Sequence, residues 1–354
     1  MILSDNMLSL AFDVRDARPW ELLDDSCIFA LHLSSGEIGY VCIMGHAGEH
    51  FAIGLYVGQR GFTSYLKSLQ IDNPSMLESM EEAMSLDYIN CDFENADALE
   101  PDVKKRIRAF AEAHKRKIRR PKGWPDFIRH SPYKPLLPIT RIEDEQVITE
   151  ALQATLALTL KLRETNDEVV GFDPNREYPT KKGGKQVPLL TPNADRGFDF
   201  GMTTLPPLLK ENYPSVVFDN EILSYSVSAL PVGGEMSCKY FHVPQAVALQ
   251  DDEDAALMPI MLCVNEEDGM VEPVMTSEEE LPSLTLLLTH LAQMFLSMKE
   301  RPSAIYVNEK RTQALLADFC RCCDIKLTLS NDLHHLEEAS EMLYMQFSML
   351  YGGV

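Results

Sequence analysis

The chain has 354 residues, of which 45% are hydrophobic and 24% charged, and its formal net charge is −22. This chain is too long to fold around a single hydrophobic core, so two folded domains are expected. The large negative charge disfavours adhesion of the whole surface to nucleic acid or to an anionic membrane.

The cysteines and the apolar segments indicate the compartment. Eight cysteines are too few for a disulfide scaffold, and most lie in apolar runs, as reduced core cysteines do. The N-terminus has no basic residues before its short apolar run, which is atypical of a secretory signal. The longest apolar segment, residues 281–298, contains Thr285, His290 and Gln293, so we expect a buried helix there. These features predict a cytoplasmic protein without membrane contact.

The first half combines period-two and helical patterns. It predicts strands at 28–33, 38–44, 51–57 and 86–93, and helices at 18–25, 58–69, 74–84 and 101–120. Residues 121–138 contain five prolines and are expected to form an extended surface arm instead of a regular element. A long helix is predicted at 141–164, and residues 166–214, rich in proline and glycine, are expected to be an irregular connection.

The second half predicts strands at 216–229, 238–249, 259–264, 270–275, 303–307 and 325–329, and helices at 281–298, 309–322 and 333–345. From residue 238 the order is β-β-β-α-β-α-β-α, which is the element order of the ribonuclease H-like fold. We therefore predict an α+β protein of two mixed-sheet domains, of which the C-terminal one has this order. The predicted divisions are an N-terminal domain at 1–140, a connection at 141–214 and a C-terminal domain at 215–354. The first half has a shorter, similar order, which suggests a structural duplication.

Element order alone does not give function. A nuclease of this fold needs carboxylates on its first and fourth strands to hold two metal ions. Here the first strand, CKYFHVPQAVAL, contains no acid, and the fourth ends in Val307 and Asn308. The sequence therefore argues against nuclease activity.

The string from His46 to His50 matches the H-x-x-E-H pattern of inverted zinc peptidases. In those enzymes both histidines lie on one helix face, whereas here Gly48 interrupts the string and both flanks are strand-like. We expect a hairpin loop, with His46 and His50 not sharing a metal ion. One interpretation is a turn that bonds to its surroundings, and another is that Glu49 and His50 line a binding groove.

Four residues form the candidate binding site. Glu49 and His50 precede a strand that leads through Tyr56 to Arg60 on the next helix. Because adjacent elements are usually neighbours in space, we hypothesise that these four side chains line a shared cleft. The alternative is that Glu49 and Arg60 form only a solvated ion pair.

Other candidate sites are weak. Cys320, Cys322, Cys323, His334 and His335 lack zinc-site spacing, and Cys320 and Cys323 fall on an apolar helix stripe. The lysines and glycines of residues 181–185 do not form a phosphate loop. No catalytic residues, metal site or cofactor are predicted.

Ten lysines and arginines and only one acid lie between Lys104 and Lys122. One interpretation is a site for an acidic partner or a nucleic acid. The favoured interpretation is a helix that docks against the acidic surface of the protein itself.

Several motifs resemble a family of uncharacterised bacterial proteins over most of residues 18–345. They are WELL from Trp20, GEIGYVCIMG from Gly36, GEHFAIGLYVGQRGFTSY from Gly48, GWPDF from Gly123, RPSAIYV from Arg301, CDIKL from Cys323 and LEEA from Leu336. The resemblance implies a two-part domain of unknown function. We favour a non-catalytic binding or regulatory protein of the bacterial cytoplasm. The alternatives are a hydrolase using Glu49 and His50, with or without metal, and a nucleic-acid accessory protein using the Lys104–Lys122 helix.

Overall fold

The computed structural model describes residues 2–25, 27–69, 75–119, 121–165, 184–210, 212–213, 215–247, 255–276 and 283–351. Its contacts divide the chain into two compact units. Unit 1 comprises Met1–Ile71, Ser85–Pro132 and Leu136–Leu209, and unit 2 comprises Asp72–Met84, Tyr133–Pro135 and Lys210–Val354. Two short segments of the first half thus pack with unit 2, while the predicted domain limits at 140 and 214 stay a prediction.

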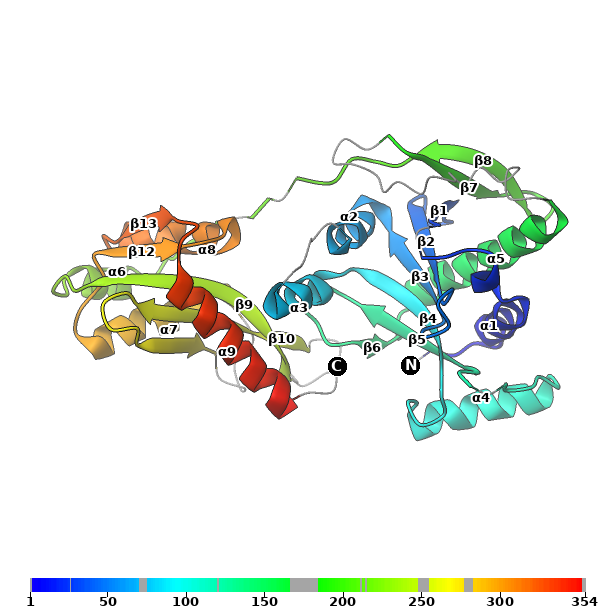
Figure 1. The fold of residues 1–354 in the computed structure, drawn as a ribbon, viewed down its shortest axis with the longest axis horizontal. Helices are drawn as coiled ribbons and strands as arrows, with labels where there is room; N and C mark the ends of the chain where they lie inside the picture. Colours follow the sequence, from blue (N-terminus) through cyan, green and yellow to red (C-terminus); the bar gives the residue numbers. More distant parts are fainter. Residues whose placement is uncertain are drawn as a thin grey trace. The chain divides into compact units, whose positions relative to one another are not determined.

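Unit 1 is built on a mixed sheet (Figure 1). Its strands run in the order β6-β5-β4-β3-β2-β1-β7-β8, and only β1 and β7 are parallel. The predicted strands of the first half are confirmed as β1 to β4. The strands are β1 (Phe29–His32), β2 (Ile38–Met44), β3 (Ala52–Val57), β4 (Tyr88–Glu94), β5 (Trp124–His130), β6 (Leu137–Pro138), β7 (Gln186–Pro192) and β8 (Phe198–Thr204).

Helices cover both faces of this sheet. α1 (Asp5–Ala17), α4 (Pro101–Ala113) and α5 (Ile142–Glu164) pack with Phe29, Leu31 and other alternate strand residues in the main core. α2 (Gly58–Ser68) covers Tyr40, Tyr56 and their neighbours on the opposite face. The chain reaches β1 through a short 3-10 helix, η1 (Pro19–Glu21).

The expected surface arm at 121–138 is wrong, because β5 and β6 lie there. Trp124 and Phe127 are buried in the main core. β5 pairs with β4 along its whole length, whereas β6 pairs only with Ile128 and Arg129. At Pro125, therefore, only β4 pairs with the strand among the described residues, and the missing N–H fits an unpaired edge.

The predicted helix at 101–120 ends early, at Ala113. Lys115 adopts a left-handed conformation with φ 54°, and the N–H of Arg116 donates to the carbonyl of Ala111. This geometry closes a helix C-terminus and sends the chain out of the helix direction. Residues 116–119 and 121–122 consequently form an irregular segment that runs back along α1.

The irregular connection expected at 166–214 is also corrected. β7 and β8 form a hairpin in its described part, and β7 adds to the sheet beside β1. Residues 166–183, including most of the lysine-glycine string, lie outside the described part of the chain. This strand was not predicted because Pro188 and Pro192 are atypical of a strand.

Unit 2 has a five-stranded mixed sheet in the order β11-β10-β9-β12-β13. β9, β10 and β11 are antiparallel neighbours, and β12 lies parallel to both β9 and β13. The element order from β9 to α9 is β-β-β-α-β-α-β-α, so the predicted ribonuclease H-like order is confirmed. The elements are β9 (Glu235–Val247), β10 (Ala256–Asn265), β11 (Val271–Met275), α7 (Leu284–Met298), β12 (Ala304–Val307), α8 (Lys310–Cys322), β13 (Lys326–Leu329) and α9 (His334–Tyr351).

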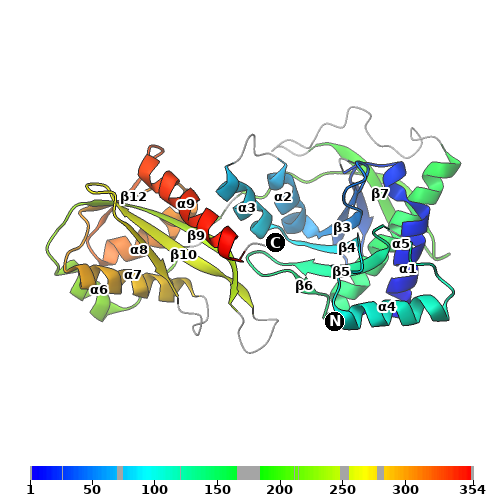
Figure 2. The ribbon, with the colours of Figure 1, turned by 60° about the horizontal axis from the view of Figure 1, so that its bottom comes forward.

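The helices of unit 2 lie on two sides of its sheet (Figure 2). α7 and α8 pack with Cys238 and Tyr240 on one face. α9 and α3 (Met76–Ser85) pack with Phe241 and Val243 on the other. The two sheets do not support a duplication, because the fourth strand pairs with the third in unit 1 and with the first in unit 2.

A strand predicted at 216–229 is wrong, because α6 (Glu221–Ser228) lies there. Asn220 caps this helix through a hydrogen bond from the N–H of Leu223 to its side chain. Its buried residues, Ser224 and Val227, are three positions apart, which is helical spacing. The strand was predicted because the segment is rich in β-branched residues, and the capping role of Asn220 was not recognised.

The described helices include none that is both long and apolar enough to span a membrane. All eight cysteines are free, and only Cys322 is not buried. Cys238 and Cys263 face each other across β9 and β10 with their sulfurs 3.5 Å apart, too far for a bond.

We expect a thiol reagent to titrate eight thiols in protein unfolded without reductant. The contact with Cys263, together with burial, raises the pKa of Cys238, and burial raises the pKa of Cys91, so these thiols react only after unfolding. The measurement is a spectrophotometric count in guanidinium chloride. Each disulfide would lower the count by two, and a low count in fresh protein would contradict the reduced state.

Candidate functional site

The loop between β2 and β3 carries the H-x-x-E-H string, and the predicted hairpin is confirmed. His46 Nδ1 lies 2.9 Å from the carbonyl oxygen of Trp20. His50 Nε2 lies 3.0 Å from Asp92 Oδ1, and its Nδ1 lies 4.0 Å from Glu94. The two imidazoles therefore engage different partners and do not form the helical pair of a zinc peptidase.

His50 belongs to a polar cluster at one end of β3 to β5. The hydrogen bond to Asp92 raises the pKa of His50, against the effect of partial burial. Asn90 Nδ2 donates to the same Asp92 oxygen at 2.7 Å. Asp126 lies opposite Asp92, and burial followed by the Asp92 charge raises the pKa of Asp126 to about 6. Within the described ranges, no group of three His, Cys, Asp or Glu residues is placed to hold a metal ion.

We expect Asp92→Asn to lower the pKa of His50, because the imidazolium loses its anionic acceptor. An NMR titration of the His50 ring in the full chain measures this directly. Glu94→Gln is the matched control, since Glu94 is 4.0 Å from the ring and its removal should change the pKa less. Equal shifts in both variants would show that the Asp92 hydrogen bond is not the main cause.

The four residues predicted to share a cleft are separated. Glu49 and His50 precede β3, whereas Tyr56 and Arg60 lie at and beyond its other end, roughly 20 Å away at 3.3 Å per residue. Tyr56 is buried against Tyr65 and Tyr88, and Arg60 is exposed with its Nε 3.7 Å from Asp87. A single cleft lined by all four is therefore wrong, and a binding role for Glu49 and His50 stays a proposal.

A large pocket adjoins the loop from Gly45 to Phe51 in unit 1. It has a volume of about 490 Å³. Basic side chains from α1, from Arg18 directly after it and from the segment after α4 line it together with two aromatic rings. The lining residues are Arg15, Arg18, Trp20, Glu21, Gly45, His46, Gly48, Phe51, Arg119, Pro121 and Lys122.

Arg15 on α1 binds the segment after α4, and both contribute basic side chains to the pocket. Its Nε and one terminal nitrogen donate to the carbonyls of Lys122 and Pro121 at 3.0 and 3.2 Å. Burial lowers the pKa of Arg15, the nearby Asp16 opposes this shift, and Arg119 adds to it. The guanidinium remains charged, because the pKa of arginine lies far above neutrality.

The other cations of the pocket have partial partners. Arg18 pairs with Glu21 at 2.9 Å, and Arg119 pairs with Asp16 at 3.1 Å. Lys122 Nζ donates to the backbone carbonyl of Glu49, which neutralises no charge. Four basic side chains and one carboxylate, that of Glu21, line the pocket, so it is positive within an acidic chain.

The rest of the basic block docks against α1. Arg106 pairs with Asp5 and Arg116 with Asp13, in addition to the pair of Arg119 with Asp16. The acidic face of α1 thus neutralises part of the block, which supports the favoured interpretation. Arg108 lies over the ring of Trp124, and Arg120 lies outside the described residues.

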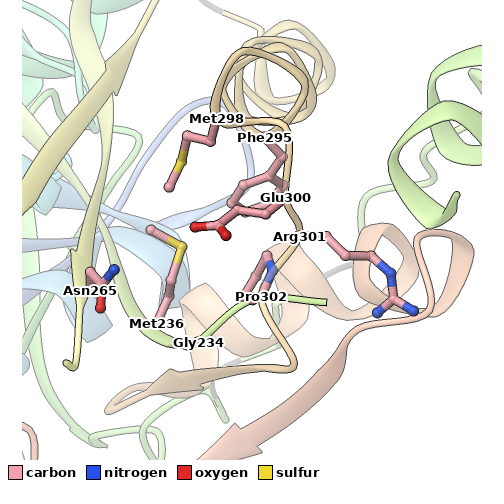
Figure 3. Close-up of a pocket in the computed structure, with 9 residues that line it drawn as sticks. Gly234, Met236, Asn265, Phe295, Met298, Glu300, Arg301 and Pro302 are labelled. Atoms are coloured by element: carbon pink, nitrogen blue, oxygen red, sulfur yellow. The ribbon is translucent and has the colours of Figure 1, made fainter. Parts of the chain in front are cut away.

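A second cavity, in unit 2, is too small for a ligand (Figure 3). Its volume is about 10 Å³, which is space for one water molecule. Figure 3 shows the Arg301 guanidinium pointing away from Glu300, and it bonds to Ser228 and Asp324. Arg301 is therefore buried, and its hydrogen bonds link Ser228 to Asp324.

The cysteine-histidine group does not converge. Cys320 and Cys323 are buried in the core of unit 2, as the apolar stripe predicted. His334 is exposed and lies 3.1 Å from Asp332. The two cysteines therefore belong to the core, and no metal-binding group includes these residues in the described part of the chain.

Comparison with known proteins confirms the resemblance to uncharacterised families. Residues 5–179 match the model of a domain of unknown function, DUF7309, and residues 229–344 match another, DUF6930. No curated protein matches the chain. A cryo-EM structure of the simian T-cell lymphotropic virus intasome in complex with PP2A regulatory subunit B56 gamma is similar at 12% identity, over 36% of this chain and 45% of that chain. Its TM-score is 0.22, a likeness from which no argument about function follows.

Proposed function

We propose that this chain is a non-catalytic binding protein of the cytoplasm and that unit 1 binds an anionic small molecule in its basic pocket. One observation carries the proposal: Arg15, Arg18, Arg119 and Lys122 gather in one concave site of a chain whose formal charge is −22. In such a chain, basic groups that only aid solubility have no reason to converge. An anion is the natural counterpart of this arrangement.

The size and lining of the pocket define the ligand class. Its 490 Å³ lies within the roughly 300–1,000 Å³ of small-molecule sites. Trp20 and Phe51, with ring centroids 4.8 Å apart, supply an apolar wall beside the cations. We therefore favour a phosphorylated small molecule with an apolar portion, since arginine forks match phosphate oxygens.

The alternatives have weaker support. A hydrolase would need a nucleophile as well as a general base. His46 Nδ1 donates to the carbonyl of Trp20, which leaves Nε2 as a base, but no described serine, threonine or cysteine lines the pocket. A nucleic-acid accessory role would need the basic block outside the pocket to be available, whereas Arg106 and Arg116 pair with α1. Exposed Lys105, Lys115 and Lys117 leave room for a weak, strongly salt-dependent contact.

Isothermal titration calorimetry of the full chain tests the ligand class. The probes are pyrophosphate, adenosine triphosphate and citrate, with a single-stranded oligonucleotide as the nucleic-acid probe. We expect saturable binding of the phosphorylated small molecules and about tenfold or greater weakening in the Arg18→Gln/Lys122→Gln variant. Lys117→Gln is the matched control, since it removes a charge of the same block outside the pocket. If the oligonucleotide binds more tightly than the small molecules, and Lys117→Gln weakens it as much as the double variant does, the nucleic-acid hypothesis would replace the proposal.

A further inference from the structure

A separate pocket in unit 2 brings opposite charges together without pairing them. It has a volume of about 220 Å³. It is lined from α3, β9, the end of β12 and α9 by Ser75, Leu77, Glu78, Lys239, Asn308, Glu337 and Glu341. No single stretch of sequence signals it, because its residues are distant in the chain.

Lys239 is the central feature of this pocket. It lies on β9, and only 9% of the residue is exposed. It occupies the face of the sheet that carries Phe241 and Val243, toward α3 and α9. No described carboxylate lies within ion-pair distance of its ammonium group, although its charge lowers the pKa of Glu81, against the dominant effect of burial. The ammonium group of Lys239 lines the pocket with no described carboxylate in ion-pair contact, so it is available to an anionic group that enters.

Asn308 supplies a hydrogen-bond acceptor beside the Lys239 ammonium group. It follows the last residue of β12, and its Oδ1 is buried without a hydrogen-bond partner. The parallel register pairs Tyr306 with Ser237, so the next positions on this face are Asn308 and Lys239, side by side.

The carboxylates of the pocket are not equivalent. Glu78 Oε2 accepts from the N–H of Ser75, and Ser75 Oγ accepts from the N–H of Glu78, which is a capping box that starts α3. Glu337 and Glu341 lie one turn apart on α9, so two like charges face the pocket from the same side. Together with Glu78, three acids and one base give the lining a net charge of about −2 at neutral pH.

We propose that unit 2 binds an amino acid-like zwitterion that carries an additional cationic group. Its carboxylate bonds to Lys239, and its amino groups bond to Asn308 Oδ1 and to Glu337 and Glu341. A pocket of 220 Å³ is below the range of drug-sized sites and fits a ligand of this size. The extra positive charge matches the acidic lining, so a dibasic amino acid is the expected class.

Calorimetry of the full chain with L-ornithine, L-lysine and L-arginine tests this inference. Putrescine presents the amines without a carboxylate, and succinate presents carboxylates without an amine. We expect at least one dibasic amino acid to bind at least about tenfold more tightly than either, and the Glu337→Gln/Glu341→Gln variant to lose about tenfold in affinity. Glu338→Gln, an exposed neighbour on α9 outside the pocket, should bind normally.

Lys239→Met keeps the length of the side chain and removes its charge. If this variant folds, it should lose preference for amino acids over putrescine, and the α9 variants test the site if it does not fold. Putrescine binding as tight as that of the dibasic amino acids would show an acidic patch only and overturn the proposal. Absence of binding by all three amino acids at millimolar concentrations would overturn it as well.

Discussion

Replacing Arg311 by methionine is expected to lower the free energy of unfolding of unit 2 by about 3–5 kcal/mol, the range for breaking a buried charged contact. The guanidinium lies between the rings of Tyr133 and Tyr240, at 4.4 and 4.5 Å from their centroids. It also lies 3.2 Å from His242 Nδ1, and its side chain is 19% exposed. Desolvated cation–aromatic contacts are worth about 2 kcal/mol each, which supports this magnitude.

Urea unfolding followed by far-ultraviolet circular dichroism measures the effect. Arg321→Met is the matched control, because Arg321 lies on the same helix and is 71% exposed. Among the described residues its partners are Asp318 and Cys322. Such an exposed pair is screened by solvent and contributes little to stability. Equal destabilisation by the two substitutions would contradict a special role for the aromatic cluster.

Glu81→Gln is expected to change the pH dependence of stability. Burial, reinforced by Glu309, raises the pKa of Glu81 to about 7 from its ordinary 4.5. Between these values the folded protein holds a proton that the unfolded chain releases, so this group lowers stability as pH rises. The shift corresponds to a loss of up to about 3 kcal/mol across the window, which glutamine cannot show.

The measurement is the unfolding free energy of both proteins from pH 4.5 to pH 7. The difference in unfolding free energy between variant and wild type cancels the contributions of the other titratable groups. This difference should grow in favour of the variant as pH rises. Glu338→Gln removes an exposed carboxylate and should leave the difference flat. A constant difference for Glu81→Gln across the range would contradict the raised pKa.

Most regular elements could be predicted because their local patterns agree with their burial. β2 was predicted at its observed bounds, since β-branched and aromatic residues fill it between two glycine-containing turns. The ribonuclease H-like element order of unit 2 followed from the same signals. The failures arose where tertiary contacts override local signals. Pro125 is tolerated at an unpaired stretch of β5, and the cap at Asn220 starts a helix in a β-branched segment.

The candidate sites were less predictable, because they are assembled from distant segments. The sequence drew attention to the loop at Glu49 and His50 and to Lys122, which meet through the Glu49 carbonyl. It gave no signal for Arg15 and Arg18, whose place in the pocket depends on how α1 packs. The assumption that Tyr56 and Arg60 join the same site failed because a strand carries them to its far end.

Trp20 offers the most direct test of the anion pocket, because it lines the site and Trp124 does not. In the Trp124→Phe variant, which leaves Trp20 as the sole tryptophan, titration with non-absorbing pyrophosphate should change the emission saturably. The same titration in the Arg18→Gln/Lys122→Gln background should require about tenfold more ligand. Calorimetric binding of pyrophosphate with unchanged Trp20 emission and no effect of the two substitutions would contradict the pocket as the binding site.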